Sequence, residues 1–457
     1  MSLKPDQEEI KNKFLEFLRT PAIKAMGIQG YGGQGKTYLI THLIDVVNKS
    51  NEIAKKVDAF HVNKEVILTA TTNKAVEVLQ EETNGNAMTV YNLFGLYPTP
   101  KYDRQTPSLY KRKRQHNLPR NSIVFIDEAS YEDEDLYFNH IKPIAKENKC
   151  KLVHVGDKYQ LLNVENTSGW LVWDVIPFTY ALKTTKRFDD NSDKAKACEA
   201  YRATIDTGVF PGGIQTGNDI IPLTGPEFKQ KIMDTYSELT YASKNCRILA
   251  WTNVTVDNYV KFIRQMHNLP MTIQSGDWCY ANGSVTVING DTKAVNNTEL
   301  WKSGSTIKLG TKHSLENKIL PSTFYFTKER IEADTGVELD FKVFDVQGFD
   351  DVSLILPKNY AATDRAIKQF VNNQFKKVGY LNKEIYPFLE MMTNRVSINY
   401  ASTVHKAQGS TYDTVFINLK DLGKCPHPNT VARLLNVAYS RAKGKVYTYG
   451  ELPIGYR

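Results

Sequence analysis

Residues 25–37 read AMGIQGYGGQGKT, and this stretch decides the fold class. Its first five residues are mostly apolar and typical of a buried strand, whereas GYGGQGKT (30–37) fits the pattern GxxxxGK[ST]. Apolar side chains follow at helical spacing: Ile40, Leu43, Ile44 and Val47. A glycine-rich turn between a strand and a helix lets successive backbone N–H groups cradle phosphate groups. The stretch therefore predicts a nucleotide-binding P-loop; the alternative is a glycine-rich turn that binds nothing.

Within this turn, each residue type has a chemical role. The glycines let the backbone approach phosphate groups, the Lys36 ammonium reaches the β- and γ-phosphates, and the Thr37 hydroxyl coordinates Mg²⁺. The candidate nucleotide-binding residues are Gly30, Gly33, Gly35, Lys36 and Thr37. ATP and Mg²⁺ are accordingly the expected cofactors, and Lys36 is also a candidate catalytic residue.

A second apolar run, IVFID (123–127), leads into two carboxylates, Asp127 and Glu128. We expect Asp127 to hold Mg²⁺ through water and Glu128 to polarise the attacking water. An acidic pair after a strand is common and is usually solvated, so this interpretation depends on the P-loop upstream. Gln160, within VGDKYQL (155–161), is a candidate γ-phosphate sensor; the alternative is an ordinary exposed turn.

Two arginines are candidates for neutralising charge on a transferred phosphoryl group, as arginine fingers do. Arg187 ends ALKTTKR (181–187), and Arg441 lies in NVAYSRA (436–442). The alternative for each is a salt-bridge arginine at a surface or between domains. STVHKAQGSTYD (402–413) places several polar residues after a strand, at the position where α/β sheets bind ligands.

Strands alternate with helices in two parts of the chain, which predicts two α/β domains with parallel, doubly wound sheets. The expected strands are AMGIQ (25–29), VILTA (66–70), IVFID (123–127), KLVHV (151–155), RILAW (247–251), SINYA (397–401), TVFIN (414–418) and KVYTY (445–449). Helices are expected over 6–20 and around 431–438. Short β-like runs between these parts, in residues 277–390, suggest a small β-barrel with a polar helix near 362–377.

Composition excludes several classes of protein. A chain of 457 residues is too long for one ordinary core, so two or three domains are expected. The five scattered cysteines form no CxxC pair, which argues against a zinc site and is typical of reduced thiols in a cytosolic compartment. The N-terminus lacks the apolar segment of a signal peptide, and no apolar run is long enough for a membrane helix. The net charge of +8 is compatible with a nucleic-acid partner.

Taken in order, these motifs resemble those of superfamily 1 helicases. The likeness is greatest to superfamily 1B, the 5′-to-3′ branch, and within it to the Dda-type helicases of T-even bacteriophages and the related RecD-type enzymes. The ordered motifs span nearly the whole chain, and the resemblance is weakest over 277–390. It implies two RecA-like motor domains that hydrolyse ATP in the cleft between them, translocate on single-stranded DNA and unwind duplexes. Phage replication or recombination, in the host cytoplasm, is the implied context.

The resemblance also implies how the chain is divided. Motor domain 1 would comprise residues 1–94 and 121–190, and a β-hairpin called the pin would comprise residues 95–120. Motor domain 2 would comprise residues 191–276 and 391–457, and the β-barrel-like insertion would comprise residues 277–390. The implied partners are single-stranded and forked duplex DNA, with single-strand-binding protein or other replisome components as further candidates. Members of this family can work as monomers, and the sequence leaves open the oligomeric state and whether the track is DNA or RNA.

Further site residues follow only from the resemblance. Gln7 matches a glutamine that reads adenine, an exposed helical glutamine being the alternative. Gln160, Arg187 and Arg441 fall on γ-phosphate-sensing positions, and Gln408 and Gly409 fall near the nucleotide. The implied DNA path contains Thr72, Asn73, Lys74, Thr89, Tyr91, Thr252, Asn253, Thr403 and His405. The chain departs from the family pattern at Tyr91, Asn163 and Ser440, where His, Pro and Thr are usual, and no catalytic group is lost.

KRKRQHNLPR (111–120) is the most basic run in the chain and lies within the implied pin. Residues 101–120 contain seven basic and one acidic residue, a local net charge of +6. Tyrosines interleave with these cations, a mixture that suits base stacking and phosphate contacts. Lys111, Arg112, Lys113 and Arg114 are therefore candidate DNA contacts. The alternatives are a solvated loop and a nuclear localisation signal.

Two other functions fit the motifs less completely. One is a single-strand translocase that displaces proteins without separating strands. The other is a non-motor P-loop ATPase that acts as a switch. The motifs between residues 402 and 442 argue against the switch, because a switch does not need a second motor domain.

Overall fold

The computed structural model describes most of the chain. The described residues are 3–56, 64–98, 110–112, 115–162, 169–183, 192–281, 285, 287–289, 306–313, 320, 322–348, 352–378 and 385–456. The chain divides into two compact units. The first comprises residues 1–224, 408–411 and 417–457, and the second 225–407 and 412–416. No helix in the described ranges is long and apolar enough to cross a membrane.

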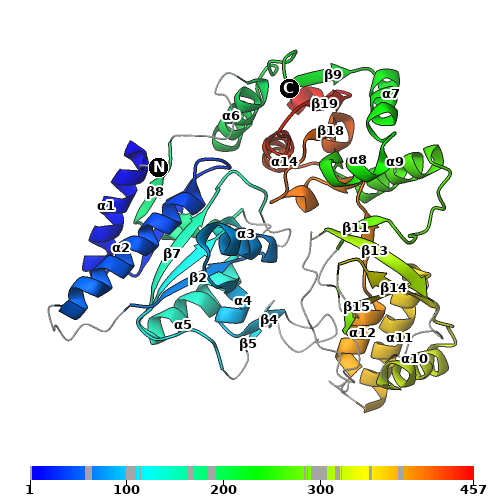
Figure 1. The fold of residues 1–457 in the computed structure, drawn as a ribbon, viewed down its shortest axis with the longest axis horizontal. Helices are drawn as coiled ribbons and strands as arrows, with labels where there is room; N and C mark the ends of the chain where they lie inside the picture. The colour runs from blue at the N-terminus through cyan, green and yellow to red at the C-terminus, as the bar shows by residue number, and fades with distance from the viewer. Residues whose placement is uncertain are drawn as a thin grey trace. The chain divides into compact units, whose positions relative to one another are not determined.

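The first unit contains a six-stranded sheet with the order β3-β2-β6-β7-β1-β8 (Figure 1). Its strands are β1 (Ala25–Gln29), β2 (Val66–Ala70), β3 (Ala87–Thr89), β6 (Ile123–Asp127), β7 (Lys151–Gly156) and β8 (Thr179–Ala181). All neighbouring pairs are parallel. The strands predicted at 25–29, 66–70, 123–127 and 151–155 are confirmed. Because the strands are parallel, the P-loop after β1 and the acidic pair at the end of β6 lie at the same edge of the sheet.

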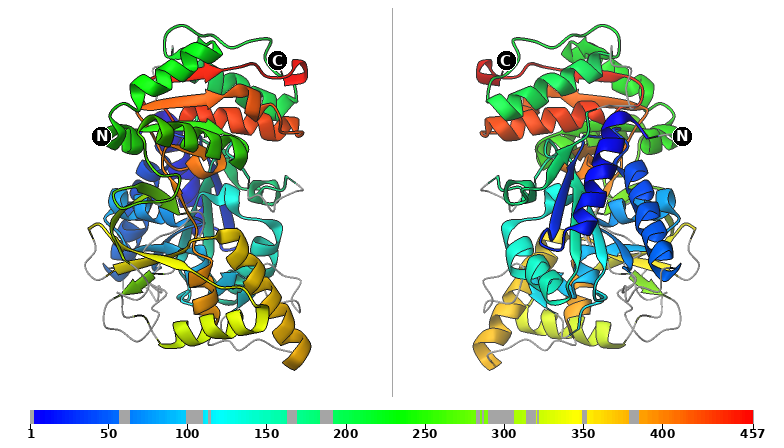
Figure 2. Two further views of the ribbon diagram at one scale, coloured as in Figure 1. Left: turned by 90° about the vertical axis from the view of Figure 1, so that its right-hand side faces the viewer. Right: turned by 90° about the vertical axis from the view of Figure 1, so that its left-hand side faces the viewer.

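Helices cover both faces of this sheet (Figures 1 and 2). One face packs against α1 (Pro5–Arg19), α2 (Lys36–Lys56) and α3 (Asn73–Thr83), and the other against α4 (Val90–Leu93), η2 (Leu136–Ile141) and α5 (Lys142–Glu147). Strand β6 contributes to both cores: Ile123 and Phe125 to the first, Val124 and Ile126 to the second. Burial on both faces explains why parallel strands of this kind read as continuous apolar runs.

A second sheet has the order β17-β10-β18-β19-β9. Its strands are β9 (Ile220–Leu223), β10 (Cys246–Ala250), β17 (Ala401–Thr403), β18 (Thr414–Asn418) and β19 (Val446–Tyr449). The pairs β10–β17 and β9–β19 are parallel. Helices in this part of the chain are α6 (Asp193–Thr207), α7 (Gly225–Thr235), α8 (Leu239–Asn245), α9 (Asn253–Met266), α13 (Leu419–Leu422) and α14 (Pro428–Ser440). The prediction of an α/β protein with two parallel sheets is confirmed.

The single strand predicted over 397–401 is wrong. The structure has two short strands there: β16 (Val396–Ile398) pairs antiparallel with β11 (Trp278–Ala281), and β17 pairs parallel with β10. The partner changes at the residues between them, since Asn399 N donates to Trp278 O (2.8 Å) and Ile248 N donates to Tyr400 O (3.1 Å). An unbroken apolar pattern cannot reveal that its two ends belong to different sheets.

The expected β-barrel over 277–390 is replaced by an antiparallel sheet with helices. The described strands have the order β12-β15-β14-β13-β11-β16, with β12 (Val287–Asn289) and β16 at the two edges. The others are β13 (Thr306–His313), β14 (Phe341–Val346) and β15 (Val352–Pro357), and the helices are α10 (Ser322–Thr335), α11 (Tyr360–Val378) and α12 (Tyr386–Met392). Helix α11 agrees with the polar helix predicted near 362–377.

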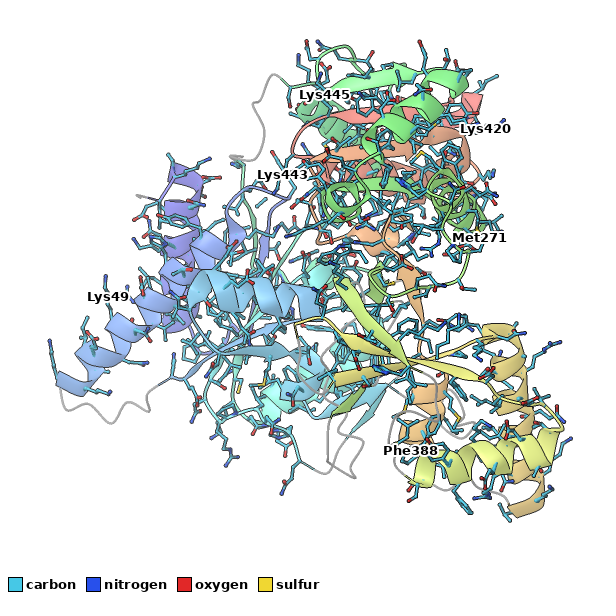
Figure 3. The ribbon with its side chains drawn as sticks, turned by 45° about the vertical axis from the view of Figure 1, so that its right-hand side comes forward. Lys49, Met271, Phe388, Lys420, Lys443 and Lys445 are labelled. Carbon is cyan, nitrogen blue, oxygen red and sulfur yellow. The ribbon has the colours of Figure 1, made fainter. Side chains whose placement is uncertain are left out.

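Among the described residues, helices bury the apolar face of this sheet. Phe324 on α10 packs edge-on against Phe341 on β14, with ring centroids 5.5 Å apart. Phe388 on α12, labelled in Figure 3, is also buried. Because β14 and β15 are covered in this way, their apolar residues need no barrel interior.

Candidate nucleotide site

The P-loop has a backbone that only glycine tolerates well. Gly33 and Gly35 have φ angles of 88° and 78°, in the left-handed region. A Cβ on Gly35 would lie 3.0 Å from Gln7 Nε2, and one on Gly30 would lie 3.0 Å from Leu182 Cδ1. Gly30 N donates to Gly156 O (2.8 Å), which fixes the start of the turn on β7. The close approach of backbone to neighbouring groups fits a phosphate cradle that precedes α2.

Two buried glutamines hold this turn in place. Gln34 is 1% exposed; its Nε2 donates to Leu182 O (3.0 Å), and its Oε1 accepts from Tyr31 N (2.8 Å). Gln7 on α1 is also buried, and its Nε2 lies 3.4 Å from the carbonyl oxygens of Gln34 and Gly35. Gln7 thus contacts the P-loop backbone directly, while its adenine-reading role stays a prediction. Sequence reasoning missed Gln34 because the motif leaves that position variable.

The acidic pair lies within electrostatic reach of the P-loop lysine. Burial raises the pKa of Asp127, and the Lys36 ammonium opposes this rise. The pKa of Glu128 is raised to about 7, first by burial and then by the Asp127 carboxylate, against the opposing charges of Lys36 and Arg441. Lys36 Nζ itself donates to Gly30 O (2.8 Å). A glutamate with a pKa near 7 is suited to take a proton at neutral pH.

The turn that carries Glu128 is tightly held. Glu128 has a φ of 51°, its N–H donates to Asp127 Oδ1 (2.9 Å), and its carbonyl accepts from Thr71 Oγ1 (2.8 Å). Its Oε2 is buried and has no hydrogen-bond partner among the described residues. A buried carboxylate oxygen without a partner is costly for stability, and such costs are typical of functional sites.

The loop that carries Gln160 is docked onto residues near the C-terminus of the chain. Gln160 Oε1 accepts from Gln408 Nε2, and Gln160 O accepts from Arg433 Nη1 (2.7 Å). Asn436 Nδ2, on the same helix α14, donates to Tyr159 O (3.0 Å). The predicted sensor is therefore held through both its side chain and its backbone.

Arg441, at the end of α14, is buried at 4% exposure. Its Nη2 donates to Ser440 Oγ (2.8 Å) and its Nη1 to Ser410 O (3.3 Å). The following turn is fixed by Lys194 Nζ, which donates to the carbonyls of Ala442, Lys443 and Gly444. Lys443 and Lys445 on this turn are exposed (Figure 3). Arg441 is close enough to Glu128 to lower the pKa of that carboxyl.

The first unit thus brings most of the predicted catalytic residues together. These are Lys36, Asp127, Glu128, Gln160 and Arg441. Gly409 is exposed, has a φ of 78°, and lies between Gln408 and Ser410, which contact this group. Arg187 lies outside the described residues. Sequence reasoning missed Thr71, Asp157, Arg433 and Asn436, which support or face these groups.

Three of the predicted DNA-contacting threonines are helix N-caps. Thr72 Oγ1 accepts from Ala75 N, Thr89 Oγ1 from Asn92 N and Thr252 Oγ1 from Thr255 N, each at 3.2 Å. Each threonine lies just after or at the end of a parallel strand and begins a helix. Capping uses each hydroxyl oxygen as an acceptor, and the Thr252 O–H also donates to Thr255 Oγ1 (2.9 Å).

The remaining candidates are placed as follows. Tyr91 stacks on Tyr110, with centroids 5.6 Å apart and an interplanar angle of 25°. Asn253 is exposed at the start of α9, Thr403 ends β17 and is buried, and burial lowers the pKa of the half-buried His405. Asn73 and Lys74 lie on α3 and Lys111 and Arg112 on β5 (Tyr110–Arg112), with side chains outside the described part of the structure; Lys113 and Arg114 are outside it entirely.

Two protein families match the chain, one over each of the two stretches that contribute residues to this site. Residues 19–166, which include the P-loop and the acidic pair, match the AAA domain. Residues 399–449, which include Gln408 and Arg441, match the UvrD-like helicase C-terminal domain. This chain is a helicase ATPase. The resemblance to superfamily 1 is supported in this coarser form, and the prediction of an ATP-hydrolysing helicase is confirmed.

Comparisons over the whole chain give weaker similarities. An uncharacterized protein of Acanthamoeba polyphaga mimivirus is 23% identical, covering 96% of this chain and 98% of the relative. The Pif1 helicase of Candida albicans is 15% identical with a TM-score of 0.47, covering 98% and 95% of the two chains. A Bacteroides Pif1 helicase, solved with ADP-AlF3 and single-stranded DNA, is 14% identical with a TM-score of 0.43, covering 100% and 94%. TM-scores below 0.5 do not establish a common fold.

Proposed function

We propose that this helicase ATPase translocates on single-stranded DNA from 5′ to 3′ and unwinds duplex DNA. The observation that carries the proposal is the convergence of Lys36, the acidic pair, Gln160 and Arg441 in one compact unit. The polarity and the Dda-type assignment rest on the ordered sequence motifs, as does a role in phage replication or recombination. The proposed motor domains are 1–94 with 121–190 and 191–276 with 391–457, with insertions at 95–120 and 277–390.

In this proposal Glu128 accepts a proton from the attacking water. Its raised pKa makes it a competent base near neutral pH, and its buried Oε2 has no other partner among the described residues to compete for that proton. Lys36 and Arg441 place positive charge where negative charge develops on the transferred phosphoryl group, with Arg187 as a further candidate. Both lie near the acidic pair, since both lower the pKa of Glu128.

The residues present fit a Mg²⁺–nucleotide complex. Gly33 and Gly35 of the P-loop have left-handed φ angles of 88° and 78°, which favour glycine and suit a turn whose backbone N–H groups bind phosphate. The Thr37 hydroxyl and Asp127 carboxylate are hard oxygen donors of the kind that Mg²⁺ prefers, and the ion supplies neutralisation of phosphate charge. Gly409 and Gln7 border the proposed site.

The contacts of the Gln160 loop could couple ATP hydrolysis to residues in the C-terminal part of the chain. Gln160, on the loop after β7, is held by Gln408 and by Arg433 of α14. A displacement of Gln160 at the γ-phosphate position would therefore change its contacts with these two residues. Arg441 ends the same helix. We propose that loss of the γ-phosphate releases these contacts and that their repeated formation drives alternating grip on DNA.

The proposed DNA contacts lie largely at helix N-termini. Helix N-termini carry partial positive charge and backbone N–H donors, so Thr72, Thr89 and the Thr252–Asn253 pair are suited to phosphate contact without sequence preference. Thr403 and His405 follow the strand β17 in the second unit. Lys111, Arg112, Lys113 and Arg114 of the pin would contact the fork.

The test is unwinding of 5′-tailed against 3′-tailed duplexes with ATP, using wild type, Lys36→Ala and Lys49→Ala. Lys49 is an exposed lysine on the same helix as Lys36 and serves as the matched control (Figure 3). We expect Lys36→Ala to abolish DNA-stimulated ATPase and Lys49→Ala to retain it, with displacement only from the 5′-tailed substrate. ATPase without displacement would indicate a protein-displacing translocase, and slow ATPase insensitive to DNA would indicate a P-loop switch.

A further inference from the structure

The described part of the proposed pin hairpin, residues 95–98, 110–112 and 115–120, is anchored to the core of the first unit. Strands β4 (Leu96–Pro98) and β5 pair antiparallel, with Leu96 opposite Arg112. Gly95, which precedes β4, has a φ of 63°, and a Cβ there would lie 2.5 Å from Gln115 O. Asn117 N donates to Leu93 O (2.9 Å). The chain segments that enter and leave the hairpin are therefore in backbone contact, so the hairpin has a defined base.

One buried side chain of the hairpin reaches the segment that follows the acidic pair. Tyr110, at the start of β5, is 9% exposed, and its hydroxyl donates to Asp133 Oδ2 at 2.7 Å. Asp133 is itself 6% exposed, and its other oxygen accepts from Leu136 N (2.8 Å). The Tyr110 ring also packs edge-on against His140, with centroids 5.8 Å apart.

The hydroxyl of Tyr110 is not required for packing. Leu96 and Val124 lie in the same apolar cluster as its ring, and phenylalanine would fill that space equally well. Burying a hydroxyl beside a carboxylate is unfavourable unless the two form a bond with good geometry, as Tyr110 and Asp133 do. The Tyr110–Asp133 hydrogen bond therefore fixes the orientation of β5 on this apolar cluster, which non-directional apolar packing alone would not do.

The segment between the acidic pair and Asp133 is rigid. Tyr131 N donates to Glu128 O (3.0 Å), and Glu132 N donates to Ala129 O (3.1 Å). Glu132 Oε1 lies 2.7 Å from His154 Nδ1 on β7, and both side chains are fully buried. Residues 127–133 are thus held at three points. Hydrogen bonds to the Glu128 carbonyl hold the first end, His154 on β7 holds Glu132, and Tyr110 holds Asp133 at the other end.

We infer that Asp133 and Tyr110 are positioning residues that hold the strand-separating hairpin to the hydrolysis segment 127–133. The inference rests on the proposed function, because it assigns the hairpin a role at the fork. Neither residue contacts nucleotide or DNA in this role. Their bond sets the orientation of the hairpin, so it governs how many base pairs are opened per ATP rather than how fast ATP is hydrolysed.

The test uses Tyr110→Phe, Asp133→Ala and Asp133→Asn in the full chain. Tyr110→Phe keeps the ring and removes the hydroxyl, and with it the hydrogen bonds to Asp133 and Tyr91. Asp133→Asn keeps one oxygen and gains an N–H that can donate to the tyrosine oxygen. The control is Tyr241→Phe, which removes an exposed tyrosine–aspartate bond of similar length, Tyr241 Oη to Asp413 Oδ2 (2.8 Å). Single-strand-stimulated ATPase, fork unwinding and the melting temperature are measured for each variant.

We expect Tyr110→Phe and Asp133→Ala to lower base pairs unwound per ATP by about tenfold. Losing a hydrogen bond to a charged group costs at least the about 1.4 kcal/mol that corresponds to a tenfold change in the equilibrium between the positioned and displaced hairpin. Their ATPase should stay within about twofold of wild type, Asp133→Asn should recover most of the unwinding, and Tyr241→Phe should match wild type. Unwinding per ATP equal to wild type in Tyr110→Phe would overturn the inference. So would a parallel loss of ATPase and unwinding with an unchanged ratio, which indicates general support of the fold.

If Asp133→Ala does not fold, Tyr110→Phe decides the question, because it removes no apolar surface. Failure of the proposed function gives a different pattern. Wild-type protein that hydrolyses ATP on single strands but never opens a fork would refute strand separation itself, whatever the variants do.

Discussion

Replacing Glu128 by Gln should stabilise the protein while destroying its turnover. Glu128 Oε2 is buried without a hydrogen-bond partner among the described residues, and the Asp127 carboxylate lies beside it. The amide is neutral at every pH, so the substitution removes a buried charge and changes shape little. Loss of a general base usually costs a factor of about 10² to 10⁴ in rate.

The magnitude follows from the pKa of Glu128. A rise from the ordinary value of 4.5 to about 7 corresponds to about 3 kcal/mol between the charged and neutral forms. Below pH 4.5 the side chain is neutral in both folded and unfolded protein, so the glutamate costs nothing. Between pH 4.5 and 7 the unfolded chain loses the proton and the folded protein keeps it, so wild-type stability falls. Above pH 7 the full penalty is present.

The assay is the pH dependence of thermal and urea unfolding for wild type, Glu128→Gln and Glu134→Gln. Glu134 is an exposed glutamate immediately after the segment 127–133 and is the matched control. The advantage of Glu128→Gln over wild type should be near zero at pH 4.5 and reach about 3 kcal/mol at pH 8. An advantage that does not change with pH, or a Glu128→Gln protein that is less stable than wild type at pH 8, would refute this reasoning. So would retention of wild-type turnover.

Three further predictions test other parts of the molecule. Arg441→Ala should lower ATPase turnover by at least about tenfold and leave single-strand affinity nearly unchanged in fluorescence anisotropy; equal loss of folded protein would support a structural salt-bridge role instead. Lys151→Met should lower the free energy of unfolding by about 2–3 kcal/mol, because Lys151 Nζ donates to the carbonyls of Phe17, Thr20 and Ile23, which would lose this donor. Urea unfolding measures this free energy, and a decrease of less than about 0.5 kcal/mol would contradict the prediction. Neutralising the four cations at 111–114 should weaken fork binding and reduce the slope of log binding constant against log salt concentration by up to about 0.9 per lost phosphate contact. An unchanged slope in a salt titration would indicate that these cations are a solvated surface loop.

The parts of the site that depend on local sequence could be predicted. The P-loop and the acidic strand were recognisable because each motif combines apolar periodicity with residues of defined chemistry at fixed spacing. The strands β1, β2, β6 and β18 have the predicted bounds for the same reason. Such elements can be inferred from the few residues that form them and the turn that follows.

The parts that depend on distant contacts could not be predicted from the residues alone. Arg433 supports Gln160 from 273 positions away, and its sequence context is an ordinary apolar helix. Helix α10 lies in a stretch whose sequence resembles short β-strands. Its buried face is determined by the packing of Phe324 on the distant Phe341, which the local sequence does not reveal. Asp133 is one carboxylate among several after β6, and only the structure pairs it with Tyr110.

The electrostatics of the acidic pair suggest how Arg441 could control hydrolysis without touching the water. Arg441 lowers the pKa of Glu128, and burial with the Asp127 charge raises it. If Arg441 moves away, the pKa of Glu128 rises further, so a smaller fraction of the carboxyl is ionised at neutral pH. When Arg441 approaches, a larger fraction is ionised and can accept a proton. Since Arg441 ends the helix that also holds the Gln160 loop, the same displacement would weaken the base and release the sensor. Arg441→Ala should therefore move the midpoint of the turnover–pH profile to higher pH, a shift that loss of transition-state charge alone would not produce.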